Sequence, residues 1–126
     1  MRHAFRRPRA ALLLLPVLLA GCDLTDPDAC TAEIVYGISV EVYNLSDGLP
    51  VVTGLAGILE EGEYSEEMRV RDNVVQGAPE RAGTYDLTIS ADGFETLRQT
   101  GISVTENECH VVTRTLTAEL TPIPLG

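Results

Sequence analysis

Alternation between apolar and polar residues is the main pattern of the chain, and it predicts β-strands. The clearest example is residues 84–90, where the apolar residues from Tyr85 to Ile89 share one face. Residues 34–42 alternate in the same way, with Ile34 and the other even-numbered residues on the apolar, core-facing side. Further strands are predicted over residues 51–59, 95–104 and 111–120.

The last predicted strand contains one residue that interrupts its pattern. In residues 111–120 the even-numbered positions, from Val112 to Leu120, take the core-facing side. Arg114 shares that side. A charged residue in this setting is expected at a sheet edge, in a pair with an acid, or at a β-bulge.

Clusters of Gly, Pro, Asn and Asp separate the predicted strands and predict turns. Residues 44–50 contain Ser-Asp-Gly followed by a proline, and residues 73–81 contain Gly77 and Pro79. Both segments are predicted as connections. Beyond residue 21 no window keeps helical periodicity over ten residues. Short strands with turn signals about every 8–12 residues are typical of a β-sandwich.

A glutamate-rich segment at residues 60–67 is predicted as a hairpin turn that leads into a strand at residues 66–72, with Met68 and Val70 inward. These carboxylates could attract a basic protein partner. They could also offer oxygen ligands to Ca²⁺, although their spacing lacks the Asp and Asn pattern of an EF-hand loop. A solvated acidic turn is the simplest interpretation, and we predict no metal site. The candidate binding residues are Glu60, Glu61, Glu63, Glu66 and Glu67.

The first 21 residues follow the pattern of an export signal. Residues 1–9 carry four arginines and no acid, and the apolar residues 10–20 are interrupted only by Pro16. This apolar run is shorter than the ~20 residues of a membrane-spanning helix. It ends in the letters LAGC at residues 19–22, which resemble the lipobox of bacterial lipoproteins. The resemblance implies that residues 1–21 are removed and that the Cys22 thiol carries a diacylglycerol. The alternative is an ordinary signal peptide followed by a chance cysteine.

Acylation of Cys22 predicts a membrane-anchored protein of the bacterial cell envelope, facing the periplasm or the outside. Each buried CH₂ of the acyl chains contributes ~0.8 kcal/mol to anchoring in the bilayer. Residues 22–30 are acidic and interrupted by Pro27, which predicts an irregular tether that reaches at most ~28 Å. Asp23 resembles the inner-membrane retention signal of enteric bacteria. Because that rule differs between bacterial groups, the inner and the outer membrane both stay open.

The charge of the chain is strongly acidic. It contains 19 acidic residues and nine arginines without any lysine, and four of the arginines lie within residues 1–21. The part beyond residue 21 is therefore more acidic than the formal net charge of −10 for the full chain. This charge disfavours binding to nucleic acid or to anionic lipid surfaces. It either attracts basic partners or keeps the surface soluble.

Three cysteines occur in the chain, and the lipobox assigns one of them to acylation. Cys30 and Cys109 then remain as a pair in an oxidising compartment, which predicts a disulfide. A disulfide between them would close a loop of about 80 residues, which would stabilise the fold by about 4–5 kcal/mol in the chain-entropy model. Neither cysteine belongs to a C-x-x-C motif or lies beside a basic cluster, which argues against a redox or nucleophilic role.

Several short motifs together point to a family. VEV at residues 40–42, DGLPV at 47–51 and AGTYDL at 82–87 are followed by ADGF at 91–94, ISV at 102–104 and the strand at 116–120. In this order they resemble the carboxypeptidase regulatory-like domain over most of residues 34–120. The resemblance implies an all-β, transthyretin-like Greek-key β-sandwich of about seven strands. We expect this domain at residues 31–121 and a tail at 122–126. The glutamate-rich hairpin departs from the family's usual middle turn.

Domains of this family are mostly accessory modules, so the resemblance implies no activity by itself. His110 is the only histidine beyond residue 21, and no G-x-S-x-G motif accompanies it. We therefore expect a non-enzymatic lipoprotein without a cofactor or catalytic residues, which presents a β-sandwich for protein binding or structural support. Its expected partners are the lipid bilayer, through Cys22, and a basic envelope protein. The alternatives are a small hydrolase centred on His110 and a Ca²⁺-dependent adhesion module that uses the acidic turn.

Overall fold

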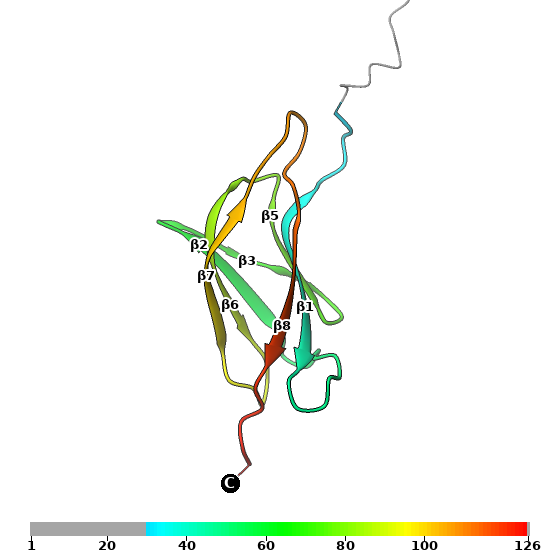
Figure 1. Ribbon diagram of the computed structural model, residues 1–126, viewed down its shortest axis with the longest axis vertical. Coiled ribbons are helices and arrows are strands. Elements are labelled where there is room, and N and C mark those ends of the chain that lie inside the picture. The colour runs from blue at the N-terminus through cyan, green and yellow to red at the C-terminus, as the bar shows by residue number, and fades with distance from the viewer. Residues whose placement is uncertain (1–29, 126) are drawn as a thin grey trace, which may run out of the picture.

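The computed structural model describes residues 30–125 as an all-β domain built from two four-stranded sheets (Figure 1). The predicted signal peptide, Cys22 and the tether up to residue 29 lie outside the described residues. The strands are β1 (Tyr36–Asn44), β2 (Ala56–Glu61), β3 (Tyr64–Glu67), β4 (Arg69–Arg71), β5 (Val74–Pro79), β6 (Gly83–Ser90), β7 (Leu97–Val104) and β8 (Arg114–Leu120). The described residues contain no helix with the length and hydropathy needed to span a bilayer.

The two sheets pack their apolar faces against each other, as in a β-sandwich. Sheet A has the order β4-β5-β1-β8, and sheet B has the order β3-β2-β6-β7. β1 pairs antiparallel with β5 and parallel with β8. The alternation predicted for β1 and β6 places their apolar side chains in one buried cluster. The largest fully buried side chains are Tyr85, Ile38, Leu59, Leu87, Ile89, Leu120, Val40, Val42 and Val75.

The prediction of a connection at residues 73–81 is wrong, because residues 74–79 form β5. This strand pairs with β1 on one side and β4 on the other. Gly77 resembled a turn residue, but it is needed for packing. A Cβ at this position would lie 2.6 Å from Leu59 Cδ1, so only a glycine lets the two sheets approach here. Pro79 occupies the last position of the strand, where its missing N–H is tolerated.

The strand predicted over residues 66–72 is two strands in different sheets. β3 belongs to sheet B and β4 to sheet A, and the chain crosses between the sheets at Met68. The Met68 N–H donates to the Gly57 carbonyl (2.8 Å). The Met68 side chain is buried as predicted, whereas Val70 is 41% exposed. All three residues of β4 are exposed, so the alternation that buries Met68 does not continue into this edge strand.

The ends of the predicted strands also differ from the structure. The strand predicted over residues 51–59 begins only at Ala56, and residues 51–55 belong to the loop after β1. Ile34 precedes β1 and is 64% exposed, so it does not belong to the core. Val111 is buried and Val112 is 47% exposed, because both residues precede β8 and follow the path of a loop. Arg114 begins β8 at the edge of sheet A, where its guanidinium donates to the Ser103 carbonyl on β7 (2.9 Å). Of the three predicted environments, the sheet edge is confirmed.

The domain has two ends with different loops (Figure 1). The disulfide end consists of residues 30–35 and 80–82 together with the β7–β8 loop at 105–113. The opposite end, called the distal end, consists of the β1–β2 loop at 45–55, the β6–β7 turn at 91–96 and the tail at 121–125. The described chain starts at the disulfide end and finishes at the distal end.

Candidate functional site

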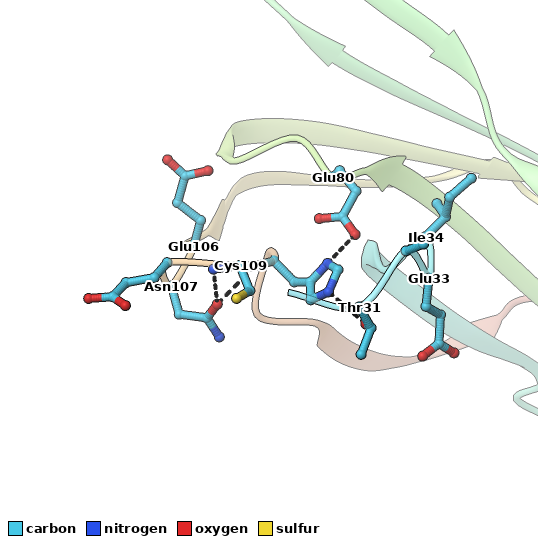
Figure 2. A pocket seen from close by; sticks show the side chains of 10 residues that line it. Thr31, Glu33, Ile34, Glu80, Glu106, Asn107 and Cys109 are labelled. Carbon is cyan, nitrogen blue, oxygen red and sulfur yellow. Dashed lines mark hydrogen bonds and ion pairs between the residues drawn. The ribbon is translucent and has the colours of Figure 1, made fainter. Parts of the chain in front are cut away.

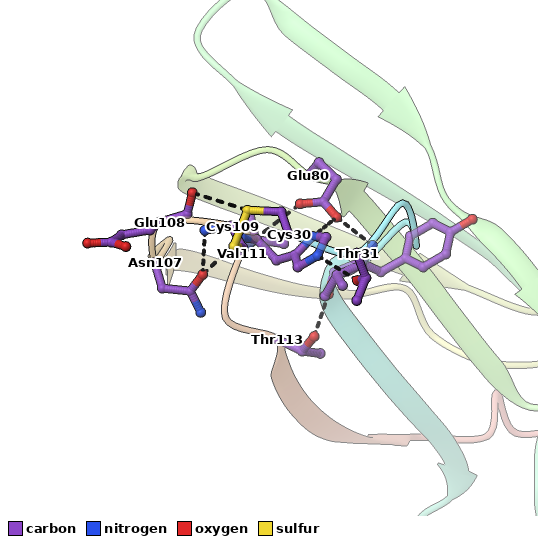
Figure 3. A network of polar contacts seen from close by, with 11 residues as sticks. Cys30, Thr31, Glu80, Asn107, Glu108, Cys109, Val111 and Thr113 are labelled. Atoms are coloured by element: carbon purple, nitrogen blue, oxygen red, sulfur yellow. Dashed lines mark hydrogen bonds and ion pairs between the residues drawn. A yellow bond between two sulfur atoms is a disulfide. The ribbon is translucent and has the colours of Figure 1, made fainter. Parts of the chain in front are cut away.

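A disulfide joins Cys30 to Cys109 at the disulfide end and confirms the predicted pair (Figure 3). The two sulfurs are 2.08 Å apart and the Cα atoms 5.0 Å apart. The bond connects the start of the domain to the β7–β8 loop across a sequence separation of 79. It therefore closes nearly the whole domain into one covalent loop.

Asn107 shapes the loop that carries the second cysteine. Its side-chain oxygen accepts hydrogen bonds from the backbone N–H groups of Cys109 and His110, both at 2.9 Å. Its own N–H donates to the His110 carbonyl (2.9 Å). Asparagine is suited to this role because its short side chain can bond the backbone a few residues ahead. The turn presents the disulfide and the His110 ring on the same side as residues 31–35.

The His110 ring bridges two other segments of the disulfide end. Its Nδ1 lies 2.5 Å from Glu80 Oε1, and its Nε2 lies 3.0 Å from Thr31 Oγ1. Figure 2 shows Glu80 and Thr31 on opposite sides of this ring. Because the ring contacts both partners, only 19% of the His110 side chain is exposed.

Glu80 is the centre of the network at this end. Its carboxylate accepts hydrogen bonds from the Val35 N–H (2.8 Å) and the Val111 N–H (3.4 Å) in addition to the His110 contact. The Val35 bond, followed by the His110 contact, holds the pKa of Glu80 below its usual value. Both Ala78 and Glu80 have positive φ angles, 54° and 49°, which are uncommon for residues other than glycine.

An open hollow of about 490 Å³ lies beside this network (Figure 2). Its lining includes the carboxylate residues Glu33, Glu106 and Glu108 together with Glu80 and His110. Within residues 30–125, no group of three or more His, Cys, Asp or Glu side chains is placed to hold a metal ion.

The three side chains of this network have the order hydroxyl, imidazole and carboxylate, as in a catalytic triad. Thr31 would be the nucleophile, His110 the base and Glu80 the orienting acid. However, both oxygens of Glu80 also bind backbone N–H groups of neighbouring segments, which is what a structural clasp requires. The network thus joins the segment before β1 to the β7–β8 loop. Whether it also hydrolyses esters can be tested.

The five glutamates predicted as one binding group have separate roles. Glu61 accepts hydrogen bonds from the Arg81 guanidinium (3.0 Å) and from the Thr84 N–H (2.5 Å), and the Thr84 bond lowers the pKa of Glu61. Glu66 accepts a bond from the Ala78 N–H (2.6 Å) at the end of β5. The remaining three, Glu60, Glu63 and Glu67, are exposed.

Arg81 completes a cluster that sequence reasoning missed. Its guanidinium lies 3.6 Å from the centroid of the Tyr64 ring and donates to the Tyr85 hydroxyl (2.8 Å). The Tyr85 hydroxyl in turn donates to the Arg81 carbonyl four residues earlier (2.8 Å). Together these contacts hold the β2–β3 hairpin against the start of β6. The sequence signal for this cluster was the four-residue spacing between Arg81 and Tyr85. This spacing predicts a contact only once the connection between β5 and β6 is known to turn at Arg81.

The comparisons with known proteins do not assign the chain to a family. None of the protein-family models matches it, and no curated protein matches it.

Proposed function

We propose that this chain is a bacterial lipoprotein whose domain serves as a non-enzymatic binding module in the cell envelope. The observation that carries the proposal is the position of the disulfide next to the predicted anchor. Residue 30 is covalently fixed at one end of the domain, only eight residues after Cys22. A disulfide that closes the domain suits the oxidising space outside the cytoplasmic membrane. Acyl chains on Cys22 would then place the disulfide end towards the membrane and the distal end away from it.

We further propose that the domain is a Greek-key sandwich of the transthyretin-like kind. The Tyr85 hydroxyl that bonds back to the Arg81 carbonyl supports this proposal, because a tyrosine corner of this type accompanies Greek-key sandwiches. Setting aside the three-residue strand β4, the remaining seven strands equal the number that the family resemblance implies.

The rigidity of the scaffold supports a binding role. One continuous apolar cluster fills the space between the sheets, and within the described residues no buried side-chain N or O atom lacks a hydrogen-bond partner. Loops on such a scaffold can carry contacts without a change of the core. The described residues also keep the acidic character of the chain, which favours basic partners.

Metabolic labelling tests the anchoring step of the proposal. The full chain is expressed in a bacterial host that is fed radiolabelled palmitate. We expect label in the wild type and none in the variant Cys22→Ala. The matched control is the double variant Cys30→Ala/Cys109→Ala, which loses two cysteines of the domain and should keep the label. Equal label in the wild type and in Cys22→Ala would contradict the proposal.

A second candidate function is hydrolysis at His110, which the contacts with Thr31 and Glu80 favour. It is tested with an activated ester such as p-nitrophenyl acetate and the full chain. The binding-module proposal expects the same rate for the wild type, His110→Ala and Thr31→Val. A rate that falls at least tenfold in both variants, while Glu106→Gln keeps it, would replace the binding module with an esterase.

A further inference from the structure

Among residues 30–125, most of the large apolar side chains that face solvent lie at the distal end. They come from the β1–β2 loop and from the C-terminal tail. They are Leu45 (54% exposed), Leu49 (61%), Val52 (54%), Ile123 (50%) and Leu125 (104%). Exposed apolar side chains that gather in one place mark an interaction surface more often than those that lie singly.

A hollow of about 290 Å³ lies beside two of these five side chains. Its apolar walls include Leu49, Val52 and Phe94. Asp47 and Asp92 line it as well, and no arginine belongs to its lining. The hollow therefore combines apolar walls with negative charge.

The loops around the hollow are braced by hydrogen bonds. Asp47 Oδ1 accepts the Leu49 N–H (2.9 Å), and the Asp92 N–H donates to the Thr53 carbonyl (3.2 Å). Gly54 has a φ of +66°, and a Cβ there would lie 2.3 Å from a carboxylate oxygen of Asp92. Only glycine therefore lets the two loops meet. A surface that is already formed before binding loses little conformational entropy when a partner arrives.

The chemistry of the hollow selects its occupant. Apolar walls accept the aliphatic stem of a long basic side chain, while the carboxylates of Asp47 and Asp92 accept its charged head. The bilayer that holds the acyl chains of Cys22 is a poor candidate ligand for this hollow. The anchor is expected at the disulfide end, and the distal end lies at the opposite end of the domain (Figure 1). Leu45 and Ile123 are exposed at the same end, where their backbone N–H groups donate to the carbonyls of Leu120 and Gly93, both at 2.9 Å.

We propose that the distal end binds a partner protein through a segment in which basic side chains alternate with apolar ones. This inference rests on the proposed function, since only the anchor at the disulfide end leaves the distal end facing outward. Binding requires both parts of the surface. The carboxylates supply attraction that weakens with salt, and the apolar side chains supply contact area that does not depend on salt.

A peptide of alternating arginine and leucine is the probe for this surface. It carries a fluorescent label, and its anisotropy is followed as the full chain, purified in a nonionic detergent, is added. We expect saturable binding that weakens as salt increases. The double variant Asp47→Asn/Asp92→Asn should bind at least tenfold more weakly. Asparagine keeps the hydrogen bond from the Leu49 N–H and the shape of the loop, so the change removes charge alone. The variant Leu49→Ser/Val52→Ser should also weaken binding.

The control variant Glu60→Gln/Glu63→Gln/Glu67→Gln removes three exposed carboxylates from the β2–β3 hairpin. It should bind as the wild type does, and a peptide of alternating glutamate and leucine should not bind. The proposal is overturned if the arginine peptide shows no saturable binding, or if the Asp47→Asn/Asp92→Asn variant keeps full affinity.

Palmitate labelling of the same preparation separates the proposal of a distal binding surface from the proposal of a lipid anchor at Cys22. A labelled chain that fails to bind the peptide refutes the distal surface, whereas an unlabelled chain refutes the anchor.

Discussion

At the scale of single residues, Glu80 has the most contacts to explain. One carboxylate binds the segment before β1 through the Val35 N–H and the β7–β8 loop through His110 and the Val111 N–H. These donors favour the ionised carboxylate, and the Val35 N–H is the main reason why the pKa of Glu80 lies below its usual value.

The pH dependence of stability follows from that shift. Because the folded-state pKa lies below the ordinary 4.5, ionised Glu80 stabilises the fold above pH 4.5, and this contribution is lost as the pH falls through the folded-state value. We predict that Glu80→Gln loses stability at neutral pH and depends less on pH below 4.5 than the wild type. Thermal unfolding of the full chain across this range measures the effect. The control Glu106→Gln, at the same end of the domain, should keep the acid dependence of the wild type.

At the scale of elements, the packing of β5 depends on the absence of a side chain at Gly77. Leu59 on β2 fills the space over Gly77, so β5 and β2 approach more closely than larger residues would allow. Pairing with β1 and β4 then holds the strand in the middle of sheet A.

This packing predicts a pair of coupled substitutions. Gly77→Ala should lower the free energy of unfolding by about 1–3 kcal/mol, because the new methyl group overlaps the Leu59 side chain. Leu59→Val alone should also be destabilising, through the space that it leaves. The double variant should be less destabilised than the sum of the two, since the smaller side chain removes the overlap. Urea unfolding of the four proteins measures the coupling. Strict additivity would show that Leu59 is not the obstacle.

Some elements could be predicted from the sequence because a single sheet face decides their pattern. β1 and β6 are of this kind, and so is the end of β7, where Ile102 and Val104 are buried. The crossing at Met68 could not be predicted, because residues 64–71 give no turn signal where the chain passes from one sheet to the other. The disulfide could be predicted from a count of cysteines and the compartment. Glu80 could not, because its partners are brought together only by the folded loops.

At the scale of the whole molecule, the disulfide acts on the unfolded chain more than on the folded one. The loop that it closes spans 79 positions, and its removal frees nearly the entire domain when the chain unfolds. The polar contacts around His110 would remain in the folded protein.

We predict that Cys30→Ser/Cys109→Ser lowers the free energy of unfolding by up to about 4–5 kcal/mol in the chain-entropy model, while the domain still folds. The denaturant dependence should become steeper, because a chain without the cross-link exposes more surface on unfolding. Urea unfolding of the full chain with and without reductant measures both effects. An unfolding midpoint of the wild type that does not move with reductant would contradict the prediction.

The charges of the molecule fit the proposed orientation. The hollow at the disulfide end is lined by Glu33, Glu80, Glu106 and Glu108, so this end would be repelled by anionic lipid headgroups. The short tether would keep the domain close to the membrane. Repulsion between the carboxylates and the headgroups would keep the domain from lying on the lipid surface. The distal end, with its apolar side chains, would remain free for a partner.

The absence of tryptophan from the chain allows the most direct test of this account. One tryptophan is placed at an exposed position of the disulfide end, Ile34→Trp, or of the distal end, Ile123→Trp. The acylated full chain is reconstituted in vesicles that contain a dansyl-labelled lipid headgroup, and energy transfer is measured. We predict strong transfer from Ile34→Trp, weak transfer from Ile123→Trp, and none from either when Cys22→Ala is added. Equal transfer from the two positions, or stronger transfer from Ile123→Trp, would contradict the proposed anchoring and orientation.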